Sequence, residues 1–342
     1  MDMLTASIQR LNCKLPFRRC QLVEICDLDY CPSFLKHLCQ NTLTQQWLRR
    51  LPLLQSQSPA QLAAQAILSA LDSLEDLETA DWTVIDFCSG AGGPIPYVER
   101  EVNRRREREG KKAIPFRLSD IHPKICLSSL DIDAWIHLSS HSRNLSFIPQ
   151  PVDASSPPFS VISATTPGDK VAAFDQGFSS DGSKVLRVYC LSFHHFDDEQ
   201  AERVVRSTLE TSDAFAIIEL QDRRVGSLVL MVMEFWLVFF ISVLWFWDEP
   251  LRLLLTYAVP ALPAVHCFDG IVSCLRTRTF GEFIGLVEEV LGSKAAVRSG
   301  GSGDGRTLLS RGDWVFEHRR VLHTWPVGFM GFTFGRKMVL GR

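Results

Sequence analysis

The stretch TVIDFCSGAGGPIPYVE, at residues 83–99, restricts the fold more than any other part of this chain. Thr83 to Phe87 is a short apolar run that predicts a buried strand, and glycines follow it where the chain must turn sharply. Tyr97 to Arg106 carries helix-forming residues, so the amide groups at the start of that helix would face whatever occupies the turn. Asp86 lies at the end of the strand and faces the same crevice. The pattern predicts a nucleotide-binding turn.

The glycines do not complete the dinucleotide fingerprint G-x-G-x-x-G, because its third glycine would fall on Ile95. This disfavours an NAD-dependent dehydrogenase. The run instead resembles the first motif of the class I S-adenosylmethionine-dependent methyltransferases, in which an acid and then two glycines follow a hydrophobic strand. Asp86, Gly90 and Gly92 match that motif. The resemblance implies a cofactor-binding set of Asp86, Ser89, Gly90, Ala91 and Gly92.

A second acid follows the next predicted strand. Residues 114–119 (IPFRLS) read as that strand, and Asp120 comes directly after it, with Ile121 behind. A carboxylate at this position offers two oxygens to the two neighbouring hydroxyls of a ribose. Asp120 is therefore the predicted ribose ligand, and Ile121 joins the predicted cofactor-binding set.

A third acid lies beyond a predicted helix at residues 123–137 and a predicted strand at residues 145–149. Asp153-Ala154 resembles the third region of the same family, where an acid followed by a small residue lies beside the adenine. A carboxylate accepts hydrogen bonds from an exocyclic amine. An Asp that only forms a turn remains the alternative.

Two histidines follow the fourth predicted strand, residues 185–193 (VLRVYCLSF). Open α/β sheets place their ligands outside the carboxyl ends of the strands, so Phe193, His194 and His195 would face the crevice. The sequence SFHHF resembles the fourth region of small-molecule methyltransferases. It implies that Phe193 contacts the cofactor and that His194 or His195 is a general base or orienting group, since imidazole accepts a proton near neutral pH. The alternative is that both histidines only shape the pocket.

The order of these strand ends predicts the fold class. It is an α/β, Rossmann-like class I methyltransferase sheet that closes with an antiparallel hairpin at residues 314–318 and 324–334. Residues 1–80 read as helices that either cover the acceptor pocket as a lid or simply pack, and residues 81–342 form the methyltransferase domain. Residues 155–183, rich in Ser, Pro, Gly and Asp, are a predicted surface insertion.

Residues 225–247 (VGSLVLMVMEFWLVFFISVLWFW) hold one charged side chain, Glu234. They are long enough to span a bilayer. A single crossing would separate the last strands from their sheet, so a hairpin is favoured, with residues 251–265 as the returning arm. Three readings stay open for the apolar segment 225–267: a hairpin in one leaflet of a membrane, a buried helix of a hydrophobic substrate pocket, and a true span.

The run from Leu254 to Arg278 resembles a little-characterised group of bacterial and fungal methyltransferase-like proteins that share an apolar pair followed by DGxVSxLR. Here that motif begins at Asp269 and ends at Arg276. These two residues either bind a substrate head group or cap and pair with one another. Thr279 and Glu282 form a capping box that predicts a helix over residues 280–291.

The composition of the chain restricts the classes of partner that it is expected to bind. The net charge of −3 and the pI near 6.3 disfavour a nucleic-acid partner, because no basic excess is present to neutralise phosphates. The ten cysteines form neither a C-x-x-C pair nor a zinc-finger pattern, so they are expected to be buried, reduced thiols, and no metal is expected. The first residues lack a signal-peptide pattern, which predicts a cytoplasmic protein or one on the cytoplasmic face of a membrane, associated through residues 225–267.

These observations predict transfer of a methyl group from S-adenosylmethionine to a small acceptor that is apolar or lipid-like. Two alternatives remain. One is a membrane-associated protein that binds S-adenosylmethionine without turnover, and the other is an NAD-dependent oxidoreductase.

Overall fold

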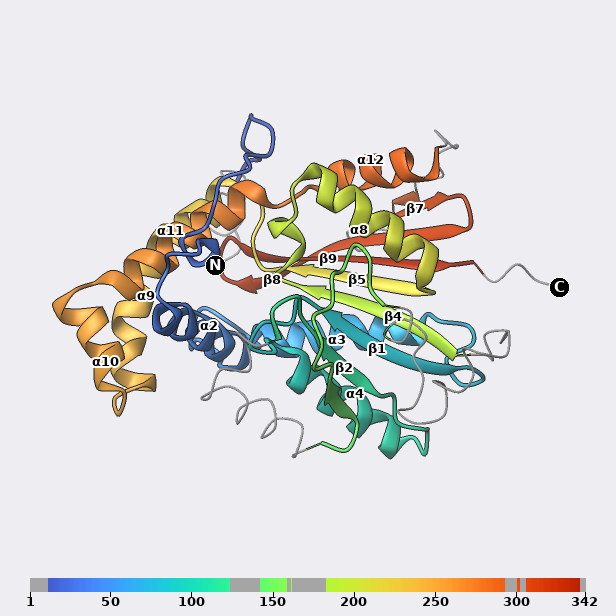
Figure 1. The fold of residues 1–342 in the computed structure, drawn as a ribbon, viewed down its shortest axis with the longest axis horizontal. Helices are drawn as coiled ribbons and strands as arrows, with labels where there is room; N and C mark the ends of the chain where they lie inside the picture. The colour runs from blue at the N-terminus through green and yellow to red at the C-terminus, as the bar shows by residue number, and fades with distance from the viewer. Residues whose placement is uncertain are drawn as a thin grey trace.

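The computed structural model describes residues 12–123, 142–158, 161, 183–292, 300–301 and 306–338, and its centre is a nine-stranded sheet (Figure 1). The strands are β1 (Asp81–Phe87), β2 (Phe116–Ser119), β3 (Leu145–Phe147), β4 (Ser183–Cys190), β5 (Ala214–Glu219), β6 (Gly300–Gly301), β7 (Thr307–Arg311), β8 (Trp314–Thr324) and β9 (Gly328–Lys337). Their order across the sheet is β3-β2-β1-β4-β5-β9-β8-β7-β6. The first five run parallel, whereas β9 pairs antiparallel with β5 and the pairings from β9 to β6 are all antiparallel. The carboxyl ends of β1 to β5 therefore meet along one edge.

Helices cover both faces of the sheet. Figure 1 shows α8 (Asp198–Thr211) and α12 (Phe280–Leu291) on one side and α3 (Pro59–Asp72) and α4 (Ile95–Arg108) on the other. Successive side chains of a strand point to opposite faces. Accordingly Val84 is buried with α3 and α4, and its neighbour Ile85 is buried in the core cluster under α8 and α12. The molecule is thus a three-layer α/β/α sandwich, and the predicted fold class is confirmed, including the antiparallel pair β8–β9.

Capping residues explain where several helices begin. Ser58 caps α3 and Gln61 returns the bond, Asp197 and Gln200 do the same at α8, and Thr279 caps α12 together with Glu282. Each capping box satisfies two amide groups that a helix start leaves without partners. The predicted helix at residues 280–291 is confirmed. The predicted helix at 123–137 lies almost wholly outside the described residues, as does most of the insertion at 155–183. Sequence analysis did not predict β6 and β7.

The apolar segment folds back on itself. The long helix α9 (Val225–Trp245) is followed by α10 (Pro250–Leu253), the π-helical turn η4 (Leu254–Ala258) and α11 (Ala261–Arg276), which returns alongside α9. A bend of 76° separates residues 250–258 from α11. The predicted hairpin is therefore the arrangement found, although its returning helix extends beyond residue 267 to Arg276.

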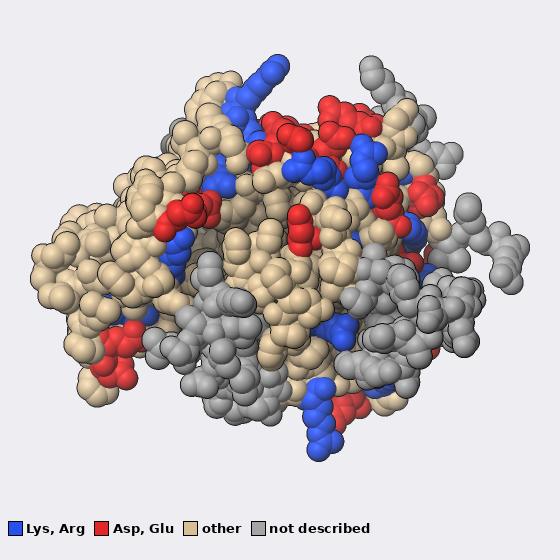
Figure 2. All heavy atoms as spheres, in the orientation of Figure 1, with Lys and Arg blue, Asp and Glu red and all other residues tan. Residues whose placement is uncertain are grey.

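The outer face of α9 is exposed and uncharged. Its exposed residues recur every three or four positions: Val225, Val229, Val232, Met233, Trp236, Phe240, Val243 and Leu244. Only 22% of the most apolar window of α9 is buried, so the reading as a buried pocket helix is wrong. Among the described residues, α9 is the one helix that is by itself long and apolar enough to cross a membrane. Figure 2 shows this end of the molecule as almost free of charge, except near the tip.

The N-terminal residues divide into two parts. Helix α3 belongs to the core of the sandwich together with α4 and the sheet. Helix α2 (Ser33–Leu48) contacts this core through Trp47, and it also packs against α9 and α11 through a small cluster that includes Cys39, Val238 and Leu262. Ahead of α2, residues 12–27 form an extended strap that ends in the 3-10 turn η1 (Ile25–Asp27). Among the described N-terminal residues, α2 approaches the glycine turn at Gly90 and the strap contacts His195, and a lid role for them remains a prediction.

The cysteines are thiols throughout the described residues, as expected. Their burial differs from the prediction. Cys31, Cys39 and Cys274 are buried, whereas Cys13 is exposed and the others are partly accessible. Cys126 lies outside the described residues.

Candidate functional site

The glycine turn is a run of residues with positive φ. Cys88, Gly90, Gly92 and Gly93 have φ values of 58°, 49°, 90° and 47°. Glycine adopts this region freely, but a cysteine there is strained, and such residues concentrate at functional sites. Asp120 fixes the turn by accepting a hydrogen bond from the Gly90 amide at 2.9 Å. Gly90, after β1, and Asp120, after β2, are both predicted to bind the cofactor, and they contact each other directly.

Asp86 is buried at the end of β1, and its Oδ1 atom has no hydrogen-bond partner. Burial, together with the nearby negative charge of Asp120, raises the pKa of Asp86 well above its usual value. A buried carboxylate oxygen without a partner costs free energy, so this atom is a candidate for binding a ligand that carries an ammonium group. Ser89 does not face the crevice. Its hydroxyl donates to the Asp86 carbonyl at 3.1 Å and accepts from the Ser119 amide at 3.1 Å.

Asp153 is exposed and its Oδ1 accepts two bonds from Ser155, from the amide at 2.8 Å and from the hydroxyl at 2.7 Å. These bonds give Asp153 the turn-forming role that was left open as the alternative. Burial raises the pKa of the Cys88 thiol, and Asp120, Asp86 and Asp153 raise it further. The three predicted carboxylates are therefore all close enough to Cys88 to act on the charge of its thiol.

The remaining predicted cofactor residues take different positions. Ile121 is 46% exposed beside Asp120, and Ala154 is buried in the core under α8. Phe193 is buried and makes edge contacts with the rings of Tyr189 and Phe283. Ala91 is partly exposed within the turn. Ile121 and Ala91 are therefore accessible to solvent, whereas Ala154 and Phe193 are part of the packed core.

His194 lies buried between two carboxylates. Its Nδ1 is 2.8 Å from Oε2 of Glu219, and its Nε2 is 3.5 Å from Oε1 of Glu24. Burial on its own would lower the pKa of His194, but the two glutamates raise it to about 10. In this state His194 carries a proton at neutral pH and has no free lone pair, so it is unsuited to act as a general base. A base role remains a prediction for His195 alone.

His195 is partly exposed, and its Nδ1 lies 3.1 Å from Oδ2 of Asp27 in the strap. Its ring lies against that of His194, with centroids 4.4 Å apart. The two histidines belong to the 3-10 turn η3 (Phe193–His195), which follows β4 at the carboxyl edge of the sheet. The strap thereby supplies acids to both histidines, and no periodicity or motif in the sequence signals Glu24 and Asp27.

Asp269 and Arg276 are bound within the protein. The Asp269 carboxylate accepts from the amides of Ile25 and Cys26, at 2.6 and 3.1 Å, and so caps η1. Arg276 is buried, donates to Oδ2 of Asp27 at 2.9 Å and also donates to the carbonyl of His195 at 2.7 Å. These contacts match the alternative in which Asp269 and Arg276 have a structural role, rather than binding of a substrate head group. The two residues do not pair with one another, however, because each binds the N-terminal strap.

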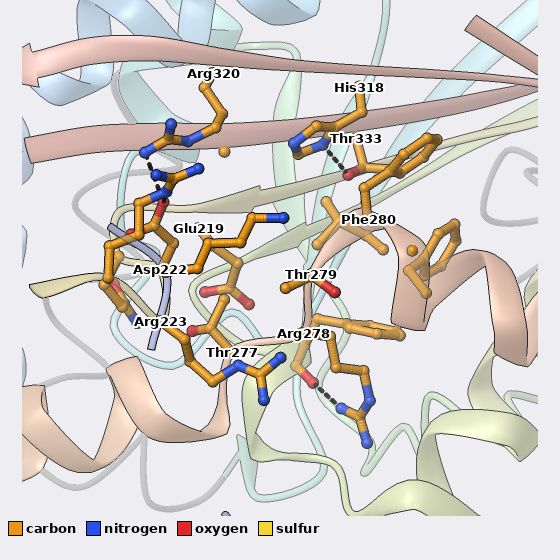
Figure 3. A pocket seen from close by; sticks show the side chains of 18 of the residues that line it. Glu219, Asp222, Arg223, Thr277, Arg278, Thr279, Phe280, His318, Arg320 and Thr333 are labelled. Atoms are coloured by element: carbon orange, nitrogen blue, oxygen red, sulfur yellow. Dashed lines mark hydrogen bonds and ion pairs between the residues drawn. The ribbon is translucent and has the colours of Figure 1, made fainter. Parts of the chain in front are cut away.

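A cavity of about 360 Å³ lies beside η3, between α12, the start of β9 and the segment after β5 (Figure 3). Phe193, Glu219, Arg223, Arg278 and Phe280 help to line it, so it is both aromatic and basic. Sequence analysis missed this cavity. Arg223 and Arg224 directly precede the apolar segment in the sequence, and only the tertiary fold brings them to the cavity wall.

Arg223 is the most unusual residue of the cavity wall. It is 7% exposed, and its Nη2 is held by Oε1 of Glu282 at 2.6 Å. Its Nε and Nη1 atoms are buried without hydrogen-bond partners. A guanidinium presents its nitrogens as a planar fork that matches a carboxylate or phosphate. Arg223 is therefore a candidate for binding an anionic group.

No family model matches the sequence, and no curated protein matches it either. Among solved structures, similarity is found to the magnesium protoporphyrin IX methyltransferase ChlM of Synechocystis PCC 6803 with bound SAM, with a TM-score of 0.35 and 8% identity over 81% of this chain and 79% of that chain. The plantazolicin methyltransferase BpumL in complex with SAH gives a TM-score of 0.44 and 10% identity, over 91% and 92%. Human N-acetylserotonin methyltransferase in complex with SAM gives 0.39 and 12%, over 91% of this chain and 58% of that chain. Likenesses this weak do not identify a reaction or a substrate.

Proposed function

We propose that this chain is a methyltransferase that uses S-adenosylmethionine and methylates a small acceptor. The observation that carries the proposal is the meeting of Asp86, Asp120 and the glycine turn at the carboxyl edge of the sheet. Parallel α/β sheets bind their ligands at this edge. When bound, the cofactor supplies a methyl group attached to a positively charged sulfur.

The residues present fit this cofactor. The partnerless Oδ1 of Asp86 suits the ammonium of the methionine part, because a cation would satisfy it and favour the ionised carboxylate. Asp120 lies at the turn with both oxygens oriented by amides, those of Gly90 and His122. Each oxygen has a further lone pair for a ribose hydroxyl. Asp153 is left for the adenine, at the rim of the same crevice.

The work left to the protein is alignment and exclusion of water. Helix α2 contributes to both. The side-chain nitrogen Nε2 of Gln40 lies 3.8 Å from the position that a Cβ atom on Gly90 would occupy. A segment this close to the turn restricts the entry of water. The same helix is anchored to α11, where His266 approaches the Cys39 carbonyl at 3.2 Å.

Calorimetric titration separates this proposal from its alternatives. S-adenosylmethionine and S-adenosylhomocysteine are expected to bind one site per chain, and NAD is expected not to bind. Binding of NAD in preference to both would favour the oxidoreductase. Binding of S-adenosylmethionine without turnover of any acceptor in a lipid or metabolite extract would favour a regulatory protein.

The acceptor is proposed to combine an acidic group with an apolar body and to occupy the cavity beside η3. Arg223 provides the unsatisfied donors for the acidic group, while Phe193 and Phe280 provide an apolar wall. Five of the residues lining the cavity are Lys or Arg and two are acidic, which favours an anion over a cation. The proposed acceptor is therefore an amphiphilic molecule with an acidic group, not a purely hydrophobic one.

The cavity assignment is tested with isotopically labelled cofactor and a total lipid extract, in which products appear one methylene heavier than their precursors. Arg223→Gln is expected to lower turnover at limiting acceptor by about 10- to 100-fold, because a charge-assisted bond is lost. Arg203→Gln, on the exposed face of α8, serves as the matched control. Products that lack an acidic group, or equal activity of both variants, would contradict the assignment.

We also propose that the hairpin α9–α11 lies flat on a membrane surface. Its single charged residue in α9, Glu234, bonds to Gln46 of α2 on the protein side, so the exposed stripe has no charge. Asp248 at the tip and Arg224 at the base bound this stripe. Charges at both ends oppose insertion of the tip, whereas exposed Trp236 and Trp247 suit the membrane interface.

A further inference from the structure

Three side chains near the end of β4 bring potential metal ligands together. Glu24, His194 and His195 each offer one ligand atom, and these atoms all lie within 4.8 Å of one another. The Nε2 atom of His194 is 3.5 Å from Oε1 of Glu24, and the Nε2 atom of His195 is 3.9 Å from Oε2 of Glu24. These separations are longer than good hydrogen bonds. Ligands about 2.1 Å from a tetrahedral Zn²⁺ are about 3.4 Å apart, so the spacing suits a shared cation.

The opposite nitrogen of each ring is bound to a carboxylate. Nδ1 of His194 lies 2.8 Å from Glu219, and Nδ1 of His195 lies 3.1 Å from Asp27. Metal-binding histidines nearly always donate their second N–H to a carboxylate or carbonyl in this way. The arrangement leaves both Nε2 atoms directed toward Glu24. An ion-pair network alone has no need for the same nitrogen of both rings to face one acid.

Helix α11 holds the carboxylates in place. Ser273 donates to Oε1 of Glu24 at 2.8 Å, and Arg276 donates to Oδ2 of Asp27 at 2.9 Å. Arg276 also donates to the carbonyl of His194 at 3.2 Å. Both residues belong to the DGxVSxLR motif, which thereby orients the acids of the strap toward the histidines. Sites of this kind require their ligands to be fixed by surrounding residues.

The charge of the cluster also favours a dication. Glu24, Glu219 and Asp27 bring three carboxylates to a largely buried region, and among the contacts described here Arg276 is the guanidinium that faces them. A divalent cation would compensate the excess negative charge.

We propose that Glu24, His194 and His195 bind a divalent transition metal ion, with Zn²⁺ as the best match to two imidazoles and one carboxylate. Three protein ligands leave a fourth position open, as in zinc sites that bind a water or a substrate. Glu219, which orients His194, also lines the basic cavity, so the ion would lie next to the place proposed for the acceptor. The prediction that no metal is bound rested on the spacing of the cysteines and left these histidines out.

Metal binding is measured without cofactor or acceptor, so the result is independent of the proposed methyl transfer. The full chain is stripped with a chelator and titrated with Zn²⁺ by calorimetry, and with Co²⁺ by visible absorption. One tightly bound ion per chain is expected, with a Co²⁺ spectrum of nitrogen and oxygen ligation. Absence of saturable binding would overturn the proposal.

Variants locate the ion. Glu24→Gln and His195→Asn are expected to abolish tight binding, and Asp27→Asn, which alters the group that orients His195, is expected to weaken it by about 10- to 100-fold. Asp29→Asn removes a carboxylate from the same segment and should bind like the unaltered chain. Thermal unfolding of each metal-free variant establishes that it is folded. Ser273→Ala, which loosens Glu24 without removing a ligand, gives a second measurement if a variant fails to fold.

Cysteines are the competing source of ligands. Cys26 is next to the cluster in the strap, and Cys31 and Cys39 follow it along the chain. Cys26→Ser is therefore expected to keep the ion. Binding that is lost in Cys26→Ser and retained in His195→Asn, or a Co²⁺ spectrum of thiolate ligation, would overturn the proposal.

Discussion

At the scale of single residues, the site is defined by polar atoms that the protein itself leaves unsatisfied. Asp86 at the end of β1 and Arg223 after β5 are both buried, and each has an atom without a partner. One is an acceptor in the cofactor crevice and the other a pair of donors in the cavity. An unsatisfied hydrogen-bond acceptor suits a cationic ligand, and unsatisfied hydrogen-bond donors suit an anionic one. This fits the proposed pair of ligands, a cationic methyl donor and an anionic methyl acceptor.

Asp120 tests the cofactor crevice. Asp120→Asn keeps the size of the side chain but replaces one acceptor oxygen by a donor, so it disturbs both the bond from the Gly90 amide and the bonds expected from ribose. The dissociation constant of S-adenosylmethionine is expected to rise by about 10- to 100-fold in calorimetry. Asp81→Asn, which changes an exposed acid at the opposite end of β1, is the control. An unchanged constant would remove Asp120 from the cofactor site.

The sequence pointed to these acids because each one lies near the carboxyl end of a strand, and the ends of parallel strands meet at one edge. Asp86 is within β1, Asp120 directly follows β2, and Asp153 comes six residues after β3. Glu24, Asp27 and Arg223 had no such signal, since they lie in irregular segments that only tertiary contacts bring to the site. Arg276 was found by its motif but given the wrong partner. Its position on α11 allowed either a substrate or the strap, and the spacing along the chain does not distinguish them.

At the scale of elements, close packing depends on residues without side chains. Gly335 of β9 pairs with Phe215 of β5, whose ring lies over it and leaves no room for a Cβ atom. The Phe215 ring is itself enclosed by Phe283, Trp314 and Phe316. In contrast, a Cβ on Gly285 of α12 would meet nothing within 4 Å.

Alanine substitutions at these two glycines are expected to have opposite effects. Gly335→Ala should lower the free energy of unfolding by about 1–3 kcal/mol, because the Phe215 ring must shift in a packed core. Gly285→Ala should raise it by about 0.5–1 kcal/mol, because alanine favours the helix and fits without contact. Urea denaturation measures both. The same sign for the two variants would mean that the β5–β9 packing is looser than described.

At the scale of the whole molecule, the end formed by the hairpin is almost free of charge, whereas acidic and basic side chains gather over α8 and α12, as Figure 2 shows for one face. The hairpin is attached to the sandwich by α2 and by Arg252, which is fully buried and donates to the Leu38 carbonyl at 3.3 Å. The apolar stripe is therefore held in a fixed orientation relative to the crevice. An acceptor drawn from a membrane would enter from that side.

Flotation with phosphatidylcholine vesicles tests this arrangement. The unaltered chain is expected to float with the vesicles, and a variant with Trp236→Asp, Phe240→Asp and Leu244→Asp is expected to remain at the bottom, since charges on the stripe oppose binding. All three residues are more than half exposed, so folding should be preserved. Tyr30→Asp changes an exposed aromatic residue elsewhere and should float. Equal flotation of the two variants would exclude the stripe as the binding surface.

Stability is expected to fall in mild acid. Burial lowers the pKa of both His318 and His323 to about 4, and the charge of Arg320 contributes at His318, with Lys14 and Asp222 also facing it. Both histidines are neutral in the folded chain, so unfolding takes up protons below the unfolded pKa of about 6.5. Their contribution is complete above that pH and is lost as the pH falls toward 4, with a slope of up to about 2.7 kcal/mol per pH unit. Denaturation of a His318→Gln, His323→Gln variant should show a flatter profile, and an unchanged profile would contradict this origin.

The strap has a consequence for how the protein is made. The bond between Arg276 and Asp27 joins residues 249 positions apart, and the one between Ser273 and Glu24 is equally distant in the chain. During translation the strap leaves the ribosome long before its partners on α11 exist. The histidine cluster consequently cannot assemble before α11 is made, and a nascent chain that stalls before residue 276 lacks strands β6 to β9 as well as a finished site.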